Sequence, residues 1–212
     1  MPPEPLLAFD TSAAQCAAAL LLPGGSCLAR TEDMAKGQAE RLVGMLEELL
    51  AEAGIGWRDL RGLGVGTGPG NFTGVRISVA TARGLALALG IPAIGVTRLE
   101  ALAHGLPRPM TVLEDARRGE VYVQEFTPEG ARPARLLALD GLRIDGPVTG
   151  SGAALAGQPA LPPALPPACP IAEAIARIAA GRAAPGLPPP APFYLRGADA
   201  APPADPPPVI LA

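Results

Sequence analysis

Histidine, cysteine and aromatic residues are scarce in this chain of 212 residues. With His104 as its single histidine, the chain alone cannot build a two-histidine metal site or a histidine-rich catalytic site. A Ser-His-Asp triad would have to use His104, which lies in a helix-like run without a nucleophile elbow nearby. Metallopeptidase and serine-hydrolase chemistry are therefore disfavoured, and we expect His104 to be an ordinary surface or helix-end residue.

An even set of cysteines, an excess of positive charge and an apolar run of membrane-spanning length are also lacking. Cys16, Cys27 and Cys169 are scattered and odd in number, which favours reduced thiols in a cytoplasmic protein. The net charge of −3 argues against a large basic face, and hence against tight unaided binding of nucleic acid. The first residues lack a basic segment, so we expect no signal peptide. We also expect no membrane-spanning helix, because no apolar run approaches the roughly 20 residues that one requires.

Glycine, by contrast, is abundant, and one Gly-rich stretch at residues 64–76 organises the chain. An apolar run at 60–65 leads into it and a longer one at 75–89 leads out, which predicts a strand, a tight turn and a helix. Glycines permit a close approach of the backbone, and a helix N-terminus attracts phosphate or carboxylate groups. The glycine spacing matches neither the dinucleotide fingerprint nor the phosphate-binding P-loop. Two interpretations stay open, namely an anion site or a turn that only packs the strand on the helix.

The rest of the chain repeats one pattern of elements. A three-strand meander opens the first half, and a second meander opens the second half. Helical periodicity and caps separate the strands that follow. The predicted strands lie at 6–9, 16–22, 26–31, 60–65, 93–96, 110–113, 121–126, 135–139 and 193–196, with a short strand and a Gly turn at 147–152, and the predicted helices lie at 39–53, 75–89, 98–102 and 171–180.

Asp10 and Asp115 hold the same place in the two halves, each ending the first strand of a meander 13 residues before a Pro-containing turn. This duplication predicts a two-lobed α/β protein of the actin-like (ASKHA, ribonuclease-H-like) class with a reduced second lobe. The two carboxylates would face each other across a cleft, where Mg²⁺ and nucleotide phosphates could bind. The alternative is that each caps a turn. The candidate nucleotide-binding residues are Asp10, Thr11, Ser12, Gly68, Gly70, Asn71 and Asp115.

Five segments of the chain resemble the TsaB (YeaZ) family, the non-catalytic paralogues of the TsaD/Kae1 proteins. They lie at 7–12, 66–77, 90–96, 115–122 and 194–196. The most specific are the Gly-Pro-Gly-Asn-Phe-Thr-Gly-Val-Arg run within 66–77 and the Asp-Ala-Arg-Arg-Gly-Glu-Val-Tyr run at 115–122. The resemblance covers residues 6–126 well and the remainder thinly.

The resemblance implies a subunit without catalytic or metal-binding residues of its own. Catalytic TsaD proteins hold a metal with His-x-x-x-His, and the matching positions here are Arg98 and Leu102, which cannot bind Fe²⁺ or Zn²⁺. Gln38 and Ala39 replace a His-Ser or His-Thr pair of many family members. The implied function is to support formation of N6-threonylcarbamoyladenosine at position 37 of tRNAs that read ANN codons. The implied partners are a TsaD-type catalytic subunit and a TsaE-type ATPase, with tRNA met only through the complex.

The resemblance further implies a homodimer when the partner is absent, no cofactor required by this chain, and possible ATP or ADP near the partner interface. We place the first lobe at residues 1–104, the reduced second lobe at 105–198 and a Pro-rich, poorly ordered tail at 199–212. Residues 159–170 are also Pro-rich and expected to be irregular. The alternatives are an independent ATP-dependent kinase of the same superfamily and a metallopeptidase, which the histidine count opposes.

The helix predicted at 75–89 has two apolar faces at 100° per residue. One face is broad enough to cover the sheet. The other carries small residues at four-residue spacing, which let a second helix approach closely. Either the helix at 39–53 of this chain is that second helix, or the two helices together present an apolar patch to a partner. The candidate partner-interface residues are Met45, Ile77, Ala80, Gly84, Leu87 and Ala88.

Overall fold

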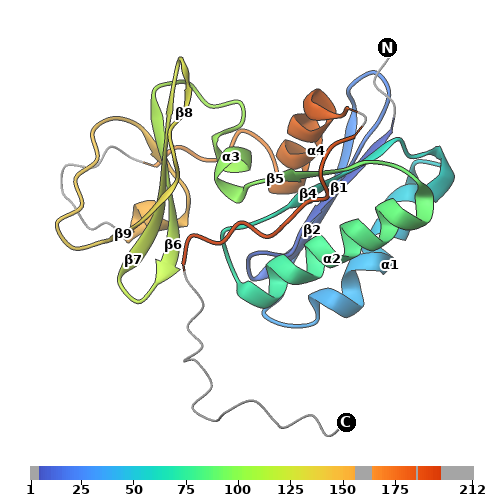
Figure 1. The fold of residues 1–212 in the computed structure, drawn as a ribbon, viewed down its shortest axis with the longest axis horizontal. Coiled ribbons are helices and arrows are strands. Elements are labelled where there is room, and N and C mark those ends of the chain that lie inside the picture. Colours follow the sequence, from blue (N-terminus) through green and yellow to red (C-terminus); the bar gives the residue numbers. More distant parts are fainter. Residues whose placement is uncertain (1–4, 156–163, 185, 197–212) are drawn as a thin grey trace, which may run out of the picture.

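The computed structural model describes residues 5–155, 164–184 and 186–196, which form two lobes side by side (Figure 1). The predicted tail at 199–212 lies outside the described residues, as does most of the first half of the Pro-rich stretch at 159–170. Each lobe is built on its own β-sheet, and the mixed α/β architecture of two sheets with helices agrees with the predicted actin-like class.

The first lobe contains a five-stranded sheet in the order β3-β2-β1-β4-β5. β1 pairs antiparallel with β2 and parallel with β4, and β4 pairs parallel with β5. Three helices cover this sheet, with α1 and α2 on one face and α4 on the other (Figure 1). The elements are β1 (Leu6–Asp10), β2 (Gln15–Leu21), β3 (Cys27–Asp33), α1 (Gln38–Glu52), β4 (Gly62–Gly66), α2 (Phe72–Leu89), β5 (Ala93–Val96) and α4 (Ile171–Arg182).

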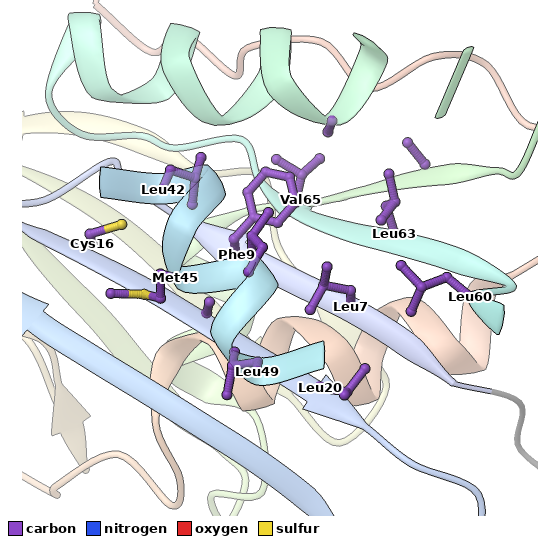
Figure 2. Close-up of a cluster of buried hydrophobic side chains, with 14 of the residues drawn as sticks. Leu7, Phe9, Cys16, Leu20, Leu42, Met45, Leu49, Leu60, Leu63 and Val65 are labelled. Atoms are coloured by element: carbon purple, nitrogen blue, oxygen red, sulfur yellow. The ribbon is translucent and has the colours of Figure 1, made fainter. Parts of the chain in front are cut away.

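The central strand β1 is buried on both faces, and its side chains alternate between two cores. Leu7 and Phe9 pack under α1 and α2 with Leu42 and Val65 (Figure 2). The intervening Ala8 faces α4 and packs with Ile175. This alternation explains why the sequence of β1 is apolar throughout rather than alternately polar.

The second lobe repeats the pairing of the first. β6 pairs antiparallel with β7 and parallel with β10, and β7 pairs antiparallel with β9. These four strands correspond to β1, β2, β4 and β3 of the first lobe, so the topology confirms the duplicated opening that the sequence predicts. The elements are β6 (Met110–Arg117), β7 (Glu120–Thr127), β8 (Gly130–Ala131), β9 (Arg135–Ala138) and β10 (Val148–Thr149).

The lobe boundaries differ from the sequence-based ones because α4 folds back. The boundary at residue 104 assigns this helix to the second lobe, yet it packs against β1, β2 and β4 of the first. The helix α3 (Arg98–Ala103) lies between the lobes, and its Leu99 and Leu102 pack with strands β6 and β7. The two lobes are therefore linked both by α3 and by the segments that flank α4.

Residues 193–196 form no strand, contrary to the prediction, but an extended segment that runs from α4 to the second lobe (Figure 1). We call residues 187–196 the strap. Prolines at 188–190 and 192 supply no backbone N–H, so this segment cannot form a regular ladder with the sheet beside it.

The helix α2 also departs from expectation. Over its 18 residues its mean hydropathy is 1.2, so it is long and apolar enough to cross a membrane by length and composition. One side nevertheless packs on the sheet through Val75, Val79 and Ala82. Only 28% of the helix is buried, so much of its apolar surface faces outward.

Candidate functional site

The Gly-rich loop between β4 and α2 packs directly on the turn that follows β1. A Cβ atom on Gly70 would lie 2.3 Å from the carbonyl oxygen of Ser12, and one on Gly74 would lie 1.9 Å from that of Thr11. The Thr11 hydroxyl donates a hydrogen bond to the Gly74 carbonyl at 2.6 Å. Asn71 caps α2, since its side-chain oxygen accepts from the Gly74 N–H at 2.9 Å. Close packing of the backbone therefore accounts for both glycines without a ligand.

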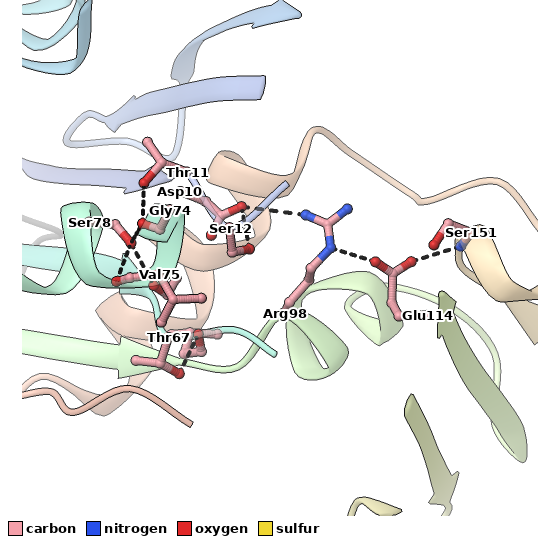
Figure 3. A network of polar contacts seen from close by, with 12 residues as sticks. Asp10, Thr11, Ser12, Thr67, Gly74, Val75, Ser78, Arg98, Glu114 and Ser151 are labelled. Atoms are coloured by element: carbon pink, nitrogen blue, oxygen red, sulfur yellow. Dashed lines mark hydrogen bonds and ion pairs between the residues drawn. The ribbon is translucent and has the colours of Figure 1, made fainter. Parts of the chain in front are cut away.

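A buried ionic network joins the two lobes (Figure 3). The guanidinium of Arg98, the first residue of α3, donates to Glu114 on β6 at 2.6 Å and to Asp10 at the end of β1 at 3.4 Å. The Ser12 hydroxyl donates to the same Asp10 oxygen at 3.0 Å. The backbone N–H of Ser151 donates to the second oxygen of Glu114 at 2.7 Å.

The network holds two carboxylates against one guanidinium. Burial disfavours the charged form of Arg98, but the attraction of the Glu114 and Asp10 carboxylates outweighs the effect of burial. The pKa of this guanidinium is therefore raised above its ordinary value. The other oxygen of Asp10, Oδ1, is buried without a hydrogen-bond partner among the described residues. A Cβ atom on Gly66 would lie 2.1 Å from that oxygen, so only glycine fits beside Asp10 on the neighbouring strand. The side chain of Asp10 is thus completely enclosed by neighbouring residues of this chain.

A cleft of about 800 Å³ lies between the lobes, next to this network. Of the predicted nucleotide-binding residues, Ser12, Gly70, Asn71 and Asp115 line the cleft. Asp10 and Thr11 are completely buried, and neither they nor Gly68 belong to its wall. The structure therefore brings together only part of the predicted set, and it corrects the placement of Asp10 from the cleft wall to the interior.

The sequence predicts that Asp115 faces Asp10 across the cleft, but the carboxylate that meets Asp10, through Arg98, is Glu114. Asp115 lies at the cleft rim, accepts a hydrogen bond from the backbone N–H of Arg117 and pairs with its side chain at 3.2 Å. Glu114 carried a signal that the sequence analysis missed. It follows Met110 and Val112 at the period of two that marks one face of a strand, and that face is otherwise apolar. An acidic residue there needs a buried cation.

A nucleotide with Mg²⁺ bound at Asp10 does not fit these residues. Its phosphates would have to displace Arg98, which already neutralises Asp10, and the glycines of the loop are occupied in packing. Among the described residues no group of three or more His, Cys, Asp or Glu side chains is placed to hold a metal ion.

The outward face of α2 is exposed where the sequence predicts a partner surface. Leu87 is 87% exposed, and Ala80, Gly84 and Ala88 are exposed as well. Apart from the backbone of α2 itself, no heavy atom of the described residues lies within 4 Å of a Cβ built on Gly84, so α1 does not lie over this position. α1 contacts α2 elsewhere, near the partly buried Ile77, and the partner surface at the exposed positions stays a prediction.

Two residues of the predicted partner set are less accessible than the rest. Ile77 is partly buried against the first core. Met45 lies on the inner side of α1 and is completely buried, because its side chain points to the sheet and not to solvent. Met45 is therefore removed from the candidate surface.

An aromatic cluster that the sequence analysis missed extends the exposed face at the N-terminus of α2. Phe72 is 51% exposed and stacks on Tyr194 of the strap, which is 46% exposed, with ring centroids 5.4 Å apart. The guanidinium of Arg76 lies 3.8 Å from the Phe72 ring centre and donates to the Tyr194 hydroxyl at 3.1 Å. Phe72, Arg76, Ala80 and Gly84 form one row at four-residue spacing. We call this row together with Leu87, Ala88 and Tyr194 the α2 face.

Comparison with known sequences identifies the relatives of the chain. The family described as "TsaD: tRNA N6-adenosine threonylcarbamoyltransferase" matches residues 31–136, half of the chain. The tRNA threonylcarbamoyladenosine biosynthesis protein TsaB of Escherichia coli is 37% identical over 126 residues, 57% of this chain and 54% of that protein. TsaB of Haemophilus influenzae is 36% identical over 133 residues, 60% of this chain and 56% of that protein. The matches thus span about half the length of these relatives.

Solved structures cover more of the chain. A Pseudomonas aeruginosa protein described as similar to peptidase YEAZ has a TM-score of 0.77 at 29% identity, covering 91% of this chain and all of the other. YeaZ from Pseudomonas aeruginosa has a TM-score of 0.71 at 30% identity, covering 84% of this chain and 93% of the other. The chain has a duplicated two-lobed fold, the TsaD family matches half of it, and YeaZ is 30% identical over 84% of it. This chain therefore belongs to the TsaB (YeaZ) family.

Proposed function

We propose that this chain is a non-catalytic subunit in the formation of N6-threonylcarbamoyladenosine at position 37 of tRNAs that read ANN codons. In this proposal it binds a TsaD-type catalytic subunit, works with a TsaE-type ATPase in the cytoplasm and meets tRNA only within the complex. Support comes from the TsaB names of its relatives and from the TsaD family that matches half of the chain.

The chemistry of the interlobe network supports a role without catalysis. Arg98 occupies the first of the two positions at which the resemblance places metal-binding histidines, and its guanidinium is committed to Glu114 and Asp10. Leu102 occupies the second and packs in the core of the second lobe. Neither side chain offers a lone pair to a metal ion.

The kinase alternative would need a Gly-rich loop that binds adenosine, and Gly150-Ser151-Gly152 is the candidate that the sequence offers. A Cβ atom on Gly150 would lie 2.3 Å from the carbonyl oxygen of Leu113, and one on Gly152 would lie 3.0 Å from it. These glycines therefore serve to pack the loop on β6. The metallopeptidase alternative finds no support in His104, which ends α3 and lies away from the network.

The observation that carries the proposed partner is the α2 face, an exposed and mostly apolar row in which Tyr194 of the strap contacts Phe72 and Arg76. Exposed apolar surface of this kind marks protein interfaces, and small residues at four-residue spacing suit close packing of another helix. We propose that the catalytic subunit covers this face in the complex and that a second copy of the chain covers it otherwise.

The test is Ala80→Arg, with Ala131→Arg on the exposed strand β8 as the matched control. Self-association is measured by light scattering, and binding by co-purification with a TsaD-type subunit. We expect Ala80→Arg to abolish both while its melting temperature stays close to that of the wild type, and Ala131→Arg to retain both.

A second readout addresses the reaction itself. Supplied with threonylcarbamoyl-adenylate, the chain alone should leave tRNA unmodified, and adding the TsaD-type and TsaE-type proteins should restore modification. Full modification by the chain alone would overturn the non-catalytic assignment. A melting temperature lowered by about 10 °C in Ala80→Arg would instead place this residue in the core of the chain.

A further inference from the structure

The strap connects segments of both lobes that are far apart in the sequence. The backbone N–H of Phe193 donates to the Thr67 carbonyl at 2.8 Å, at the end of β4. Tyr194 then stacks on Phe72 at the start of α2. Arg196 reaches the second lobe, where it donates to the Ala116 carbonyl at 2.9 Å and to the Glu120 carboxylate. Within four residues, the strap therefore contacts the Gly-rich loop, α2 and the β6–β7 hairpin.

The ionic network is a second connection, and it ends on the same hairpin. Arg98 joins Asp10 of β1 to Glu114 of β6, as Arg196 joins the strap to Glu120 of β7 (Figure 3 shows the first connection). The two arginines come from different elements, α3 and the strap. The hairpin of the second lobe is therefore fixed to the first lobe at two places, each by a charged pair.

Separation of the lobes would leave buried charges without partners. The side chains of Asp10, Glu114 and Arg98 are 0%, 8% and 13% exposed, whereas those of Arg196 and Glu120 are 21% and 35% exposed. Breaking the buried pair of Arg98 and Asp10 is far more costly than breaking a pair at the surface, and the half-buried pair of Arg196 and Glu120 adds to this cost. Other two-lobed proteins close around ligands by hinge motions that few contacts oppose.

We propose that Arg98 and Arg196 act as two interlobe latches that hold the cleft at one width, so the chain is a rigid body rather than a hinge that closes on a ligand. This inference goes beyond the proposed function and does not depend on a partner or on tRNA. The α2 face is held rigid in the same way, because the strap that carries Arg196 also supplies Tyr194 to that face.

The test measures the distance between the lobes by double electron–electron resonance. Spin labels are placed at Glu47→Cys on α1 and Ala138→Cys on β9, both exposed positions, in a chain that also carries Cys27→Ser and Cys169→Ser. Cys16 is retained because it is buried. Labelled protein is diluted with unlabelled protein so that only distances within one chain contribute.

We expect one narrow distance distribution in the wild-type background, unchanged by saturating Mg-ATP or Mg-ADP. The double variant Arg98→Gln/Arg196→Gln should lose the narrow peak, whereas the control Arg135→Gln, which removes an exposed pair within the second lobe, should retain it. A broad or bimodal distribution in the wild-type background, or a shift on adding nucleotide, would overturn the proposal. So would a folded double variant with the wild-type distribution. If the double variant does not fold, the wild-type distribution alone decides.

Discussion

The Nε atom of Arg98 lies 2.6 Å from a carboxylate oxygen of Glu114, and these residues belong to the two elements, α3 and β6, that meet at the junction of the lobes. Asp10 binds the same guanidinium from the first sheet. One arginine thus pairs with a carboxylate from each lobe, at the place where the sequence predicts carboxylates for Mg²⁺ and phosphate.

Replacing Arg98 should therefore destabilise the protein strongly. Arg98→Met leaves Asp10 and Glu114 as buried carboxylates without a cation, and we expect the free energy of unfolding to fall by about 3–5 kcal/mol. Urea unfolding monitored by circular dichroism measures this loss. The control Arg135→Met removes a pair whose side chains are 56% and 45% exposed, and should cost about 0–1 kcal/mol. Equal losses in the two variants would show that the interlobe network does not stabilise the fold.

Two glycines of α2 should respond oppositely to alanine. Gly74→Ala forces a Cβ atom to within 1.9 Å of the Thr11 carbonyl oxygen, so the loop must move and we expect a loss of at least about 1–3 kcal/mol. Gly84→Ala meets no atom outside the backbone of its own helix within 4 Å and should gain roughly 0.5–1 kcal/mol through helix propensity. Thermal melting of both variants compares them directly. A stable Gly74→Ala variant would contradict the packing role assigned to the Gly-rich loop.

Glu100 should make stability depend on pH. It accepts hydrogen bonds from the Thr97 backbone N–H at 3.0 Å and from Arg182 at 2.7 Å. Burial opposes ionisation, but the bonds from Arg182 and Thr97 outweigh it, so the pKa of Glu100 lies below its ordinary value of 4.5. Because the folded pKa is the lower one, this contribution is fully present above about pH 4.5 and is lost as the pH falls through the folded pKa.

The variant Glu100→Gln tests this dependence. At neutral pH it should unfold at lower urea concentration than the wild type, and the difference should shrink as the pH falls below 4.5. Glu47→Gln, at an exposed position of α1, should behave as the wild type at each pH. A difference that stays constant with pH would indicate lost packing and not lost charge.

His104 offers a spectroscopic check of the junction between α3 and α4. Burial, with the positive charge of Arg177, lowers the pKa of this imidazole below 6.5. The chain has one histidine, so its ring proton resonances can be followed through a pH titration by NMR without assignment. We expect a midpoint below 6.5 and an upward shift in Arg177→Gln. A wild-type midpoint at or above 6.5 would mean that His104 is more exposed in solution than in this structure.

Local signals in the sequence were sufficient for most of the fold. The predicted meanders, the helix after the Gly-rich loop and the Thr97 cap of α3 all depend on side-chain period, glycine or capping within a few residues, and all are present. The placement of α4 was not predictable in this way. Its alanine-rich apolar face fits either sheet, and only long-range packing selects the first.

The candidate site was predicted less well, because it depends on which side of a strand each residue faces. Asp115 and Glu114 are adjacent in the sequence but point to opposite sides of β6, and only Glu114 meets the network. Likewise, the apolar row on α2 was visible in its sequence, whereas its extension by Tyr194 requires a contact across 122 residues of chain.

The strap also packs against the edge strand of the first sheet. β5 is an edge strand, and an open edge offers N–H and C=O groups to any extended chain that meets it. Pro190 of the strap lies beside Gly95 in the middle of β5, where a Cβ atom on the glycine would be 3.4 Å from the proline side chain. Because a Cβ atom points out of the plane of a sheet, this contact places Pro190 on a face of β5 and not along its edge. With prolines at 188, 189, 190 and 192, the strap cannot itself pair as a further strand. Removal of the strap would thus expose this face of β5, a change separate from any in the cleft.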